Sequence, residues 1–543
     1  MNKKNRENIY LEEYENQFSY KKSKSNLKIE FNRVAFIFFI FLIISIIYSI
    51  QLLHLGSLKK NTEKKKSLIY KKNYRADIID RNGNYLVKTV SSVDIGINPT
   101  EVIDKKKLLI NLQLIFPEKN YIEIKKKLQR KKFFYFEKKI SAEKYEKIML
   151  LGDKSIIPEE KLTRIYPQKN LFSHIIGQID DDNNGISGIE KSFDNELKEF
   201  KKPLELTVDT DIQFLIREEL LRFKPIFQDI GSTAILMDVN NGDIISMVSL
   251  PDFNLNERKT ITDLNYINRA TKGVYELGSV FKTFTIAAGL DAGLIEPETE
   301  FLDLEKKLTC GKSTITEYDN KILSDLTVEE ILIKSGNIGS VRIGQMLEIE
   351  GLKSFLEKIG VLRKIDFDIE EVGQPIPFRW GKCKLATVSF GHGITTTPLQ
   401  LAKAYGIISN GGFEINPTLI KNKKENSKKR LIKKNTSKAI NLILRKIVVE
   451  GTAKLANVNG YEVGGKTGTA NKSVKGGYSR KKINTFSSIF PTSNPKFALV
   501  VLMEETQISP DYIYEYRDGS KFKLKGSPRN TAAWTSVEVA GKI

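Results

Sequence analysis

The sequence predicts an α+β architecture: an antiparallel sheet flanked by helices, preceded by a single transmembrane helix and an elongated α+β pedestal module. Three observations predict it: an uncharged apolar run near the N-terminus, a lysine-rich middle region, and two hairpin patterns that bracket a mostly helical stretch. The 543 residues exceed one ordinary domain. We divide the chain into a tail (1–33), a transmembrane anchor (34–54), a stalk and pedestal (55–202) and a C-terminal domain (203–543).

The composition limits the partners and cofactors that we expect. The formal net charge is +21, but the basic residues are scattered and no nucleic-acid-binding motif accompanies them, so we expect no nucleic-acid partner. His54, His174 and His392 form no metal-ligand pattern, and we expect neither a metal nor a cofactor. Cys310 and Cys383 could pair in an oxidising compartment, and the sequence leaves that pairing open.

The anchor is predicted from Val34–Ile50, which contains no charged residue and is extended by Leu52 and Leu53. As a helix, this stretch would span roughly 30 Å, the thickness of one bilayer core. It is too long and too far from the N-terminus for a typical signal peptide, and no small-residue cleavage site follows it. We therefore predict a retained single-pass anchor.

The charges that flank the anchor predict one orientation and the chemistry below predicts the other. The tail holds eight basic and five acidic residues, whereas Gly56–Arg75 holds eight basic residues and only Glu63. The positive-inside rule alone would place the C-terminal body in the cytoplasm. We expect the body outside the cytoplasm, because the candidate chemistry belongs there and large domains translocate despite flanking charge.

The body begins with a basic stalk and a pedestal. Lys59–Tyr74 is polar and basic, and an extended segment follows that ends in the turn Asn82-Gly83. Residues from about 100 to 200 alternate lysine-rich helical stretches with short apolar runs and contain no catalytic constellation. We interpret this region as a pedestal or partner-binding module.

The C-terminal domain carries two hairpin patterns. Ser232–Val239 and Ile244–Ser249 are apolar runs joined by a turn sequence, Asn-Asn-Gly-Asp. Phe486–Phe490 and Phe497–Met503 form a second pair. Strands at both ends with helices between them predict an antiparallel sheet with packed helices.

The first candidate motif is Ser279-Val-Phe-Lys282, at the start of an apolar helix. The i, i+3 spacing places both side chains on one face, where a desolvated lysine can take the proton of a serine nucleophile. The same pattern recurs elsewhere in this lysine-rich chain, for example at Ser141–Lys144. A helix-capping serine with an exposed lysine is the alternative, and the buried context of Ser279 favours the nucleophile.

The second motif, Ser335-Gly-Asn337, follows an amphipathic helix that ends at a polar turn. Ser335 is expected to relay a proton between Lys282 and a leaving amine, and Asn337 to hold a substrate amide. Taken alone, this motif is a common turn.

The third motif, Lys466-Thr467-Gly468-Thr469, lies in a strand-like segment after two glycines. A cation with two flanking hydroxyls suits a substrate carboxylate, and Gly468 lets a peptide backbone approach closely. The backbone N–H groups of Ser279 and Thr469 are candidates for an oxyanion hole. A second cation near Lys282 would also lower the pKa of that lysine.

With these three motifs in this order, the sequence resembles the penicillin-binding proteins, serine D,D-transpeptidases of bacterial cell-wall synthesis. Further segments resemble class B of that family, and the likeness covers nearly everything from residue 75 onward: Arg75…Asp80-Arg81-Asn82-Gly83, Arg164-Ile-Tyr-Pro167, Gly185-Ile-Ser-Gly188-Ile-Glu190, Leu206-Thr-Val-Asp209 and Ser389-Phe-Gly-His-Gly393. Within class B, Tyr275–Lys282 and Asn337 look most like the division-specific septal enzyme. The usual proline before the Gly-Ser pair is Leu277 here.

The resemblance implies a transpeptidase domain at 203–543 that acts outside the cytoplasm on peptidoglycan stem peptides ending in D-Ala-D-Ala. Ser279 would attack the penultimate D-Ala carbonyl, release the terminal D-Ala and pass the acyl group to an amine of a neighbouring strand. β-Lactams would acylate the same serine. The resemblance also implies a membrane glycosyltransferase partner, divisome partners and an inner-membrane location.

Two alternatives stay open for the biological role. An elongation-specific class B enzyme shares the motifs, although that relative more often has Asp where Asn337 stands. A membrane-anchored β-lactam sensor also keeps Ser279, Lys282 and Lys466, but it would be expected to carry a cytoplasmic signalling domain. The crosslink chemistry, β-lactam affinity and oligomeric state are not determined by the sequence.

Overall fold

The computed structural model describes residues 35–55, 74–200, 202–257, 263–311, 313–423, 429–474 and 477–543. The chain divides into two units, Met1–Tyr74 and Arg75–Ile543. In the first unit, the described residues form one helix, Ala35–Leu55, with a mean hydropathy of 2.6, long and apolar enough to cross a membrane. The predicted tail at 1–33 and nearly all of the predicted stalk lie outside the described residues.

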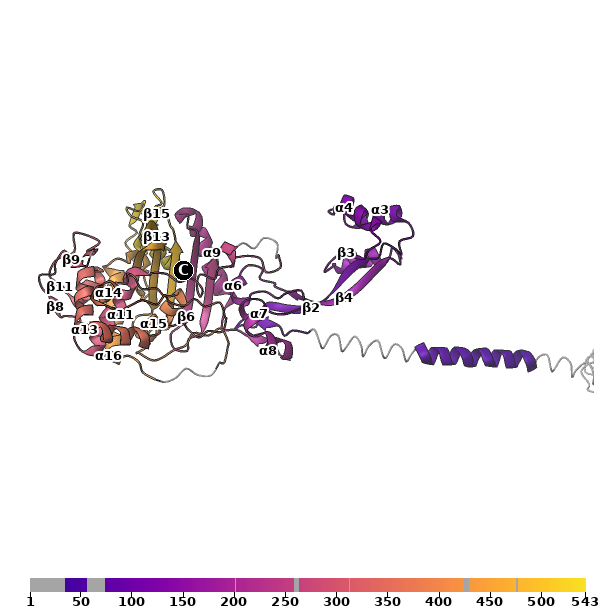
Figure 1. Ribbon diagram of the computed structural model, residues 1–543, viewed down its shortest axis with the longest axis horizontal. Coiled ribbons are helices and arrows are strands. Elements are labelled where there is room, and N and C mark those ends of the chain that lie inside the picture. Colours follow the sequence, from indigo (N-terminus) through magenta and orange to yellow (C-terminus); the bar gives the residue numbers. More distant parts are fainter. Residues whose placement is uncertain are drawn as a thin grey trace, which may run out of the picture. The chain divides into compact units, whose positions relative to one another are not determined.

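The second unit begins with a long two-stranded ribbon (Figure 1). β2 (Tyr85–Ile97) pairs antiparallel with β4 (Ile156–Ile165) in unbroken register. β1 (Ile78–Ile79) pairs with the start of β2 and, in parallel, with β5 (Leu204–Glu205). The predicted Asn82-Gly83 turn connects β1 to β2, and the Asp80 carboxylate accepts the N–H groups of Asn82 and Asn84 at 2.8 Å.

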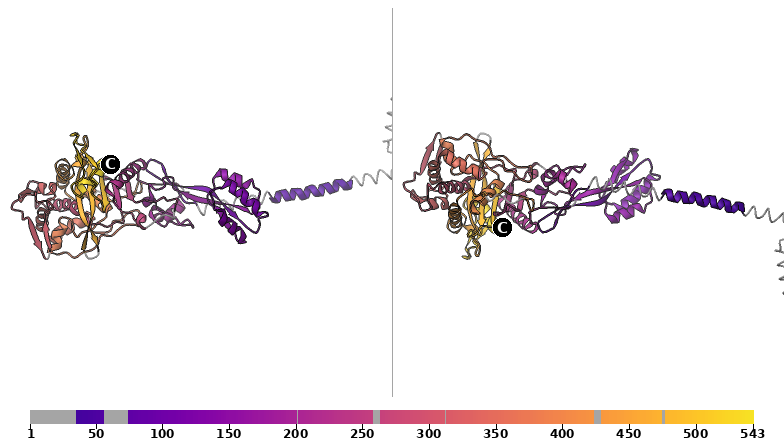
Figure 2. Two further views of the ribbon diagram at one scale, coloured as in Figure 1. Left: turned by 90° about the horizontal axis from the view of Figure 1, so that it is seen from above. Right: turned by 90° about the horizontal axis from the view of Figure 1, so that it is seen from below.

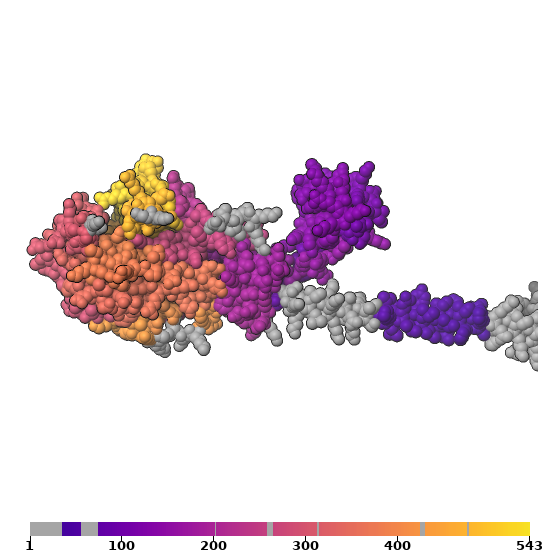
Figure 3. Space-filling model, viewed as in Figure 1, coloured from indigo at the N-terminus to yellow at the C-terminus, as the bar shows by residue number. Residues whose placement is uncertain are grey.

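The far end of the ribbon carries a small lobe with its own core, seen as a separate mass in the space-filling view (Figure 3). Its elements are β3 (Phe134–Glu137), α3 (Lys105–Ile115), α4 (Tyr121–Gln129) and α5 (Ala142–Met149). Side chains of Asp104, Asn120 and Ser141 cap the three helices. Leu112, Phe116 and the inward face of β3 form the centre of the lobe core, so this region folds around apolar residues despite its many lysines.

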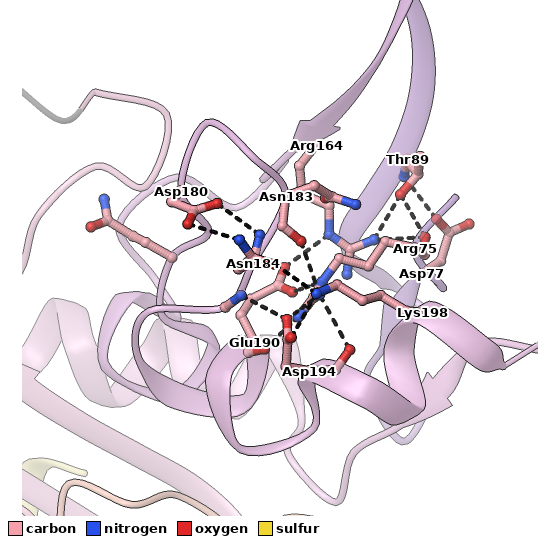
Figure 4. Close-up of polar contacts among 12 residues, drawn as sticks. Arg75, Asp77, Thr89, Arg164, Asp180, Asn183, Asn184, Glu190, Asp194 and Lys198 are labelled. Atoms are coloured by element: carbon pink, nitrogen blue, oxygen red, sulfur yellow. Dashed lines mark hydrogen bonds and ion pairs between the residues drawn. The ribbon is translucent and has the colours of Figure 1, made fainter. Parts of the chain in front are cut away.

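The near end of the ribbon is held by a buried ion-pair network (Figure 4). Glu190 of α7 (Gly188–Ser192) is fully buried, and each of its carboxylate oxygens accepts from one guanidinium. Arg75 Nε lies 2.5 Å from one oxygen and Arg164 Nε 2.8 Å from the other. Arg75 also contacts Asp194 of α8 (Asp194–Glu199) at 2.7 Å. The residues that resemble the class B N-terminal module are therefore one electrostatic unit.

The C-terminal domain contains a five-stranded antiparallel sheet in the order β12-β13-β14-β6-β7. The strands are β6 (Gly231–Asp238), β7 (Ile244–Leu250), β12 (Gly464–Val474), β13 (Gly477–Phe490) and β14 (Phe497–Glu504). The two predicted hairpins are β6–β7 and β13–β14. The third-motif segment lies in β12, which pairs antiparallel with β13 along nearly its full length and forms one edge of the sheet.

Helices cover both sides of this sheet, and the buried residues of the domain form one apolar core (Figures 1 and 2). α9 packs on β6 and β7, and α17 packs on α9, β13 and β14. α15 packs on β6, β13 and β14 and also on α16. α11 packs against α13 and α16. The bounds are α6 (Ser173–Ile176), α9 (Thr210–Phe227), α10 (Asp263–Tyr266), α11 (Lys282–Ala292), α12 (Val328–Ile333), α13 (Asn337–Lys358), α14 (Lys382–Val388), α15 (Pro398–Ser409), α16 (Lys434–Val449) and α17 (Ser536–Lys542).

The stretch between the two hairpins is less uniformly helical than its sequence predicts. It contains two small sheets, β8 (Glu300–Phe301) with β11 (Leu326–Thr327) and β9 (Lys307–Cys310) with β10 (Ser313–Thr316). A further pair, β15 (Ile513–Glu515) with β16 (Lys523–Lys525), lies near the C-terminus. These strands are short and lie largely at the surface, so they leave little apolar periodicity in the sequence.

The two cysteines form a disulfide. Cys310 at the end of β9 is bonded to Cys383 in α14, 73 residues further along the chain. The pairing that the sequence left open is therefore present, and it fastens the β9–β10 hairpin to a helix of the main body.

Replacing Glu190 with Gln tests the buried network. The change keeps the side-chain shape but leaves two buried guanidinium groups without their anion, so we expect the free energy of unfolding to fall by about 3–5 kcal/mol. Denaturant unfolding of the full chain in detergent measures the loss. The matched control is Glu143→Gln, which breaks the exposed pair with Lys147 and should change stability negligibly. Equal stability of the two variants would contradict the assigned role.

Candidate active site

Ser279 lies in a short 3₁₀ turn, Gly278–Phe281, that leads directly into α11. Gly278 has φ +62°, and a Cβ there would lie 2.8 Å from the carbonyl oxygen of Thr469, so only glycine suits this position. The buried hydroxyl of Tyr405 donates to the carbonyl of Val280 at 3.2 Å. These contacts fix the turn while Ser279 itself stays partly exposed.

Lys282 is the first residue of α11 and has no exposed surface. Its Nζ donates to Ser335 Oγ at 3.2 Å, to the Ser335 carbonyl and to Asn337 Oδ1 at 2.6 Å. The hydrogen-bond partners of Lys282 are thus residues of the second motif. The helical spacing had instead predicted Ser279 as its neighbour. Burial lowers the pKa of Lys282 to about 7, and the negative charge of Glu317 opposes that shift.

Ser335 occupies the bend between α12 and α13, and the whole residue is buried. Its φ is +58°, a left-handed conformation that costs a non-glycine residue of order 1 kcal/mol or more. The bend is fixed by backbone hydrogen bonds from Ser335 to Leu332 and from Gly336 to Ile331. The sequence predicted the turn, but not the strained backbone that aims the hydroxyl.

Lys466 of β12 is also fully buried and completes the cluster. Its Nζ donates to Ser335 Oγ at 2.9 Å and to the Thr467 carbonyl at 3.1 Å. A single hydroxyl, Ser335 Oγ, therefore lies within hydrogen-bond distance of two buried amines. Burial, and then the nearby charge of Lys282, lower the pKa of Lys466 well below its ordinary value.

Gly468 brings β12 against the turn that carries Ser279. A Cβ at this position would lie 2.1 Å from the Leu277 carbonyl oxygen and 3.0 Å from Val280. The sequence predicts that Gly468 lets a substrate backbone approach. The structure shows a second role, because a side chain at this position would collide with the Ser279 turn. The absence of a side chain sets the distance between the first and third motifs.

These residues meet at one cleft of about 610 Å³. Ser279, Ser335, Asn337, Thr467 and Thr469 line it. Lys282, Lys466 and Gly468 are not among the lining residues, and the two lysines are completely buried. Every residue that the sequence singled out thus lies in or next to a single cavity, which no motif alone could predict.

The cleft is also lined by residues that the sequence did not indicate as candidate site residues. Tyr318 and Asp319 follow β10, and Arg529 and Trp534 come from the C-terminal segment. His392 also lines the cleft, and its ring is tilted against the Tyr478 ring, with the two ring centroids 4.7 Å apart. The glycine-rich sequence around His392 was the one available signal; the C-terminal residues carry no local pattern.

The arrangement supplies a nucleophilic hydroxyl, a buried amine that titrates near neutral pH, a bridging hydroxyl and a second amine. These are the parts of a serine acyl-transfer site. Within the described ranges, no group of three or more His, Cys, Asp or Glu side chains could hold a metal ion.

Comparisons with known proteins identify the two domain families of the chain. The profile of the penicillin-binding protein transpeptidase domain matches residues 232–522, and that of the penicillin-binding protein dimerisation domain matches residues 70–218. A probable peptidoglycan D,D-transpeptidase FtsI of Caulobacter vibrioides is 28% identical over 86% of this chain and 80% of its own length. Stage V sporulation protein D of Bacillus subtilis is 30% identical over 79% of this chain and 74% of its own length.

A relative and a solved structure extend the match over most of the chain. The peptidoglycan D,D-transpeptidase FtsI of Buchnera aphidicola is 28% identical over 90% of this chain and 93% of its own length. The crystal structure of penicillin-binding protein 3 from Mycobacterium tuberculosis, complexed with aztreonam, has a TM-score of 0.66 at 21% identity. It covers 87% of this chain and 95% of that one, and it shares the fold.

Replacing Gly468 with Ala tests the contact between β12 and the Ser279 turn. The added methyl group would overlap the Leu277 carbonyl, so we expect a loss of stability of about 1–3 kcal/mol, the usual range for overpacking. Thermal unfolding of the full chain measures it. Gly381→Ala is the control, because a Cβ there meets nothing within 4 Å. If both variants unfold at the wild-type temperature, the contact does not constrain the site.

Proposed function

Since the chain belongs to the class B penicillin-binding proteins and is a peptidoglycan D,D-transpeptidase, we propose that it acts through an acyl-enzyme formed on Ser279. The observation that carries the proposal is the position of Ser335 Oγ, 3.2 Å from the Nζ of Lys282 and 2.9 Å from the Nζ of Lys466. Ser279 and Ser335 line the same cleft.

In the acylation step, the neutral form of Lys282 takes the proton of Ser279 as its oxygen attacks the penultimate D-Ala carbonyl of a stem peptide. A pKa of about 7 means that roughly half of the Lys282 amines are neutral at neutral pH. The backbone N–H groups of Ser279 and Thr469 are the proposed oxyanion hole. Collapse of the tetrahedral intermediate breaks the peptide bond and leaves the acyl group on Ser279.

Ser335 is proposed to return the proton to the departing D-Ala amine. Its hydroxyl contacts both amines, so it can accept a proton from Lys282 while giving its own to the leaving group. In the second step, an amine of a neighbouring strand attacks the ester carbonyl, loses its proton to the same relay and frees Ser279. One new peptide bond, the crosslink, has then replaced the peptide bond that was broken, and the protons have returned to their starting groups.

The remaining motif residues are proposed to hold the substrate. Asn337, Thr467 and Thr469 line the cleft, where an amide and a carboxylate of the stem peptide would lie. Lys466, whose Nζ lies 3.1 Å from the Thr467 carbonyl, is proposed to meet the carboxylate in its protonated form. β-Lactams, which present a strained amide and a carboxylate, are proposed to use the same contacts.

Disulfide formation supports a location outside the cytoplasm. The Cys310–Cys383 bond is of a kind that persists in oxidising compartments and is rare in the cytosol. This argues against the orientation that the charges beside the anchor predict. We propose a single-pass inner-membrane protein with Ala35–Leu55 as its anchor and the catalytic domain in the periplasm.

We also propose the domain limits and partners that the sequence predicted: an anchor at 34–54, a pedestal at 55–202 and a transpeptidase domain at 203–543. The enzyme would act in septal wall synthesis with a membrane glycosyltransferase and divisome proteins. The septal role is supported by the name FtsI that relatives from Caulobacter vibrioides and Buchnera aphidicola carry. The alternative is the elongation-specific role.

Labelling with a fluorescent penicillin tests the nucleophile. We expect the full chain to be labelled and Ser279→Ala to lose the label completely, because the variant lacks the hydroxyl that we propose as the nucleophile. The matched control is Ser141→Ala, which removes the serine of another Ser-x-x-Lys pattern, where the side chain caps α5. Label that persists in Ser279→Ala would show that the nucleophile is wrong.

Depletion in the native host tests the septal role. Cells that cannot build a septum continue to elongate, so we expect long filaments in phase-contrast microscopy. Complementation with the wild-type gene should restore division, and complementation with Ser279→Ala should not. Round cells in place of filaments would move the enzyme to side-wall elongation.

A further inference from the structure

Glu317 is a charged residue next to the active site that no motif of the sequence singled out. It follows β10, and its carboxylate binds the N-terminus of α13 with both oxygens. Oε2 accepts the N–H of Asn337 at 2.7 Å, and Oε1 accepts the N–H of Ile338 at 2.8 Å. The N-cap position of α13 is Gly336, which has no side chain, so Glu317 supplies the cap from another element.

The same segment also orients the side chain of Asn337. Asn337 Nδ2 donates to the carbonyl of Thr316 at 2.7 Å. A carbonyl can only accept, so this contact fixes which end of the amide points away from the hairpin. The opposite end, Oδ1, is therefore turned toward Lys282 Nζ, 2.6 Å away.

We propose that Glu317 is a positioning residue for acylation, which holds Asn337, and through it the amine of Lys282, in place for the attack by Ser279. The inference rests on the proposed roles of Ser279 and Lys282. Glu317 does not touch the reacting atoms. It acts through two backbone hydrogen bonds and one amide.

The charge of Glu317 gives this role a second component. Its anion opposes the effect of burial on Lys282 and raises the pKa of that lysine toward the neutral range. Without the anion, burial alone would lower the pKa further and leave a weaker base. Glu317 therefore sets both the place and the basicity of the amine.

The hairpin that carries Glu317 is itself anchored. β9 and β10 form a two-stranded sheet at the surface, which is marginal on its own. The disulfide from Cys310 to Cys383 ties it to α14, and the loop after α14 lines the cleft with Phe390 and His392. This anchorage explains how a short surface hairpin can hold a catalytic helix terminus.

The pH dependence of acylation by a fluorescent penicillin tests the proposal, measured on the full chain in detergent. For the wild type we expect the rate to rise with pH to a midpoint near 7, because the neutral form of Lys282 is the reactive one. In Glu317→Gln the midpoint should move to lower pH, because the anion that favours the lysine cation is gone. The rate at the plateau should fall about tenfold or more, since a displaced catalytic group loses much of its effect.

Two further variants separate positioning from a general structural effect. Glu317→Ala removes the cap as well as the charge and should lose more rate than Glu317→Gln. Glu305→Gln removes an exposed carboxylate from the neighbouring surface, where it pairs with Arg342 at 3.3 Å, and should keep the wild-type profile. Thermal unfolding of each variant identifies any loss of fold.

A folded Glu317→Gln protein with the wild-type midpoint and plateau would overturn the inference, as would a midpoint that moves to higher pH. Failure of the positioning role can be distinguished from failure of the proposed function. If Ser279→Ala still forms the acyl-enzyme, the mechanism fails; if only the Glu317 variants behave as the wild type, the mechanism stands and the positioning role fails.

Discussion

The structure depends on one contact, the hydroxyl of Ser335 between the amines of Lys282 and Lys466. These three groups come from a helix terminus, a strained bend and an edge strand, and all three are buried. Two amines cannot easily both stay charged in such a place, because burial and mutual repulsion disfavour the second charge. Burial in the surrounding core thus lowers the pKa of both lysines, and brings that of Lys282 to about 7.

Close backbone contacts determine how the elements around Ser335 are placed. Gly278 and Gly468 let the Ser279 turn lie directly against β12, where a methyl group at either position would meet backbone oxygen. On the opposite side, the β9–β10 hairpin reaches the start of α13 and is held by a disulfide. The geometry of the candidate site is therefore set by backbone packing, and its polar side chains lie between the packed segments.

Much of this could be predicted from the sequence, for physical reasons. The anchor, the two hairpins and the buried helix after Ser279 follow from unbroken apolar runs and turn residues, which are local signals. The three motifs were identified and the Ser335 relay to Lys282 was expected, but the bonds of Lys282 to Asn337 and of Lys466 to Ser335 were not, because they join residues 55 and 131 positions apart. Glu317 and Trp534 were missed for the same reason: nothing in their neighbours marks them, and only the folded chain brings Glu317 to the start of α13 and Trp534 to the cleft.

The most direct test of the buried amine pair is how stability depends on pH, independently of any substrate. The reference is a variant that replaces both amines, Lys282→Met with Lys466→Met, and stability is measured by denaturant unfolding from pH 7 to 10. A folded-state pKa below the unfolded value means that unfolding takes up a proton in this window. The wild type should therefore gain stability with rising pH relative to the variant, by about 1.4 kcal/mol per pH unit for an amine that is neutral in the fold. Parallel stability curves would show that both lysines stay charged and would contradict the account.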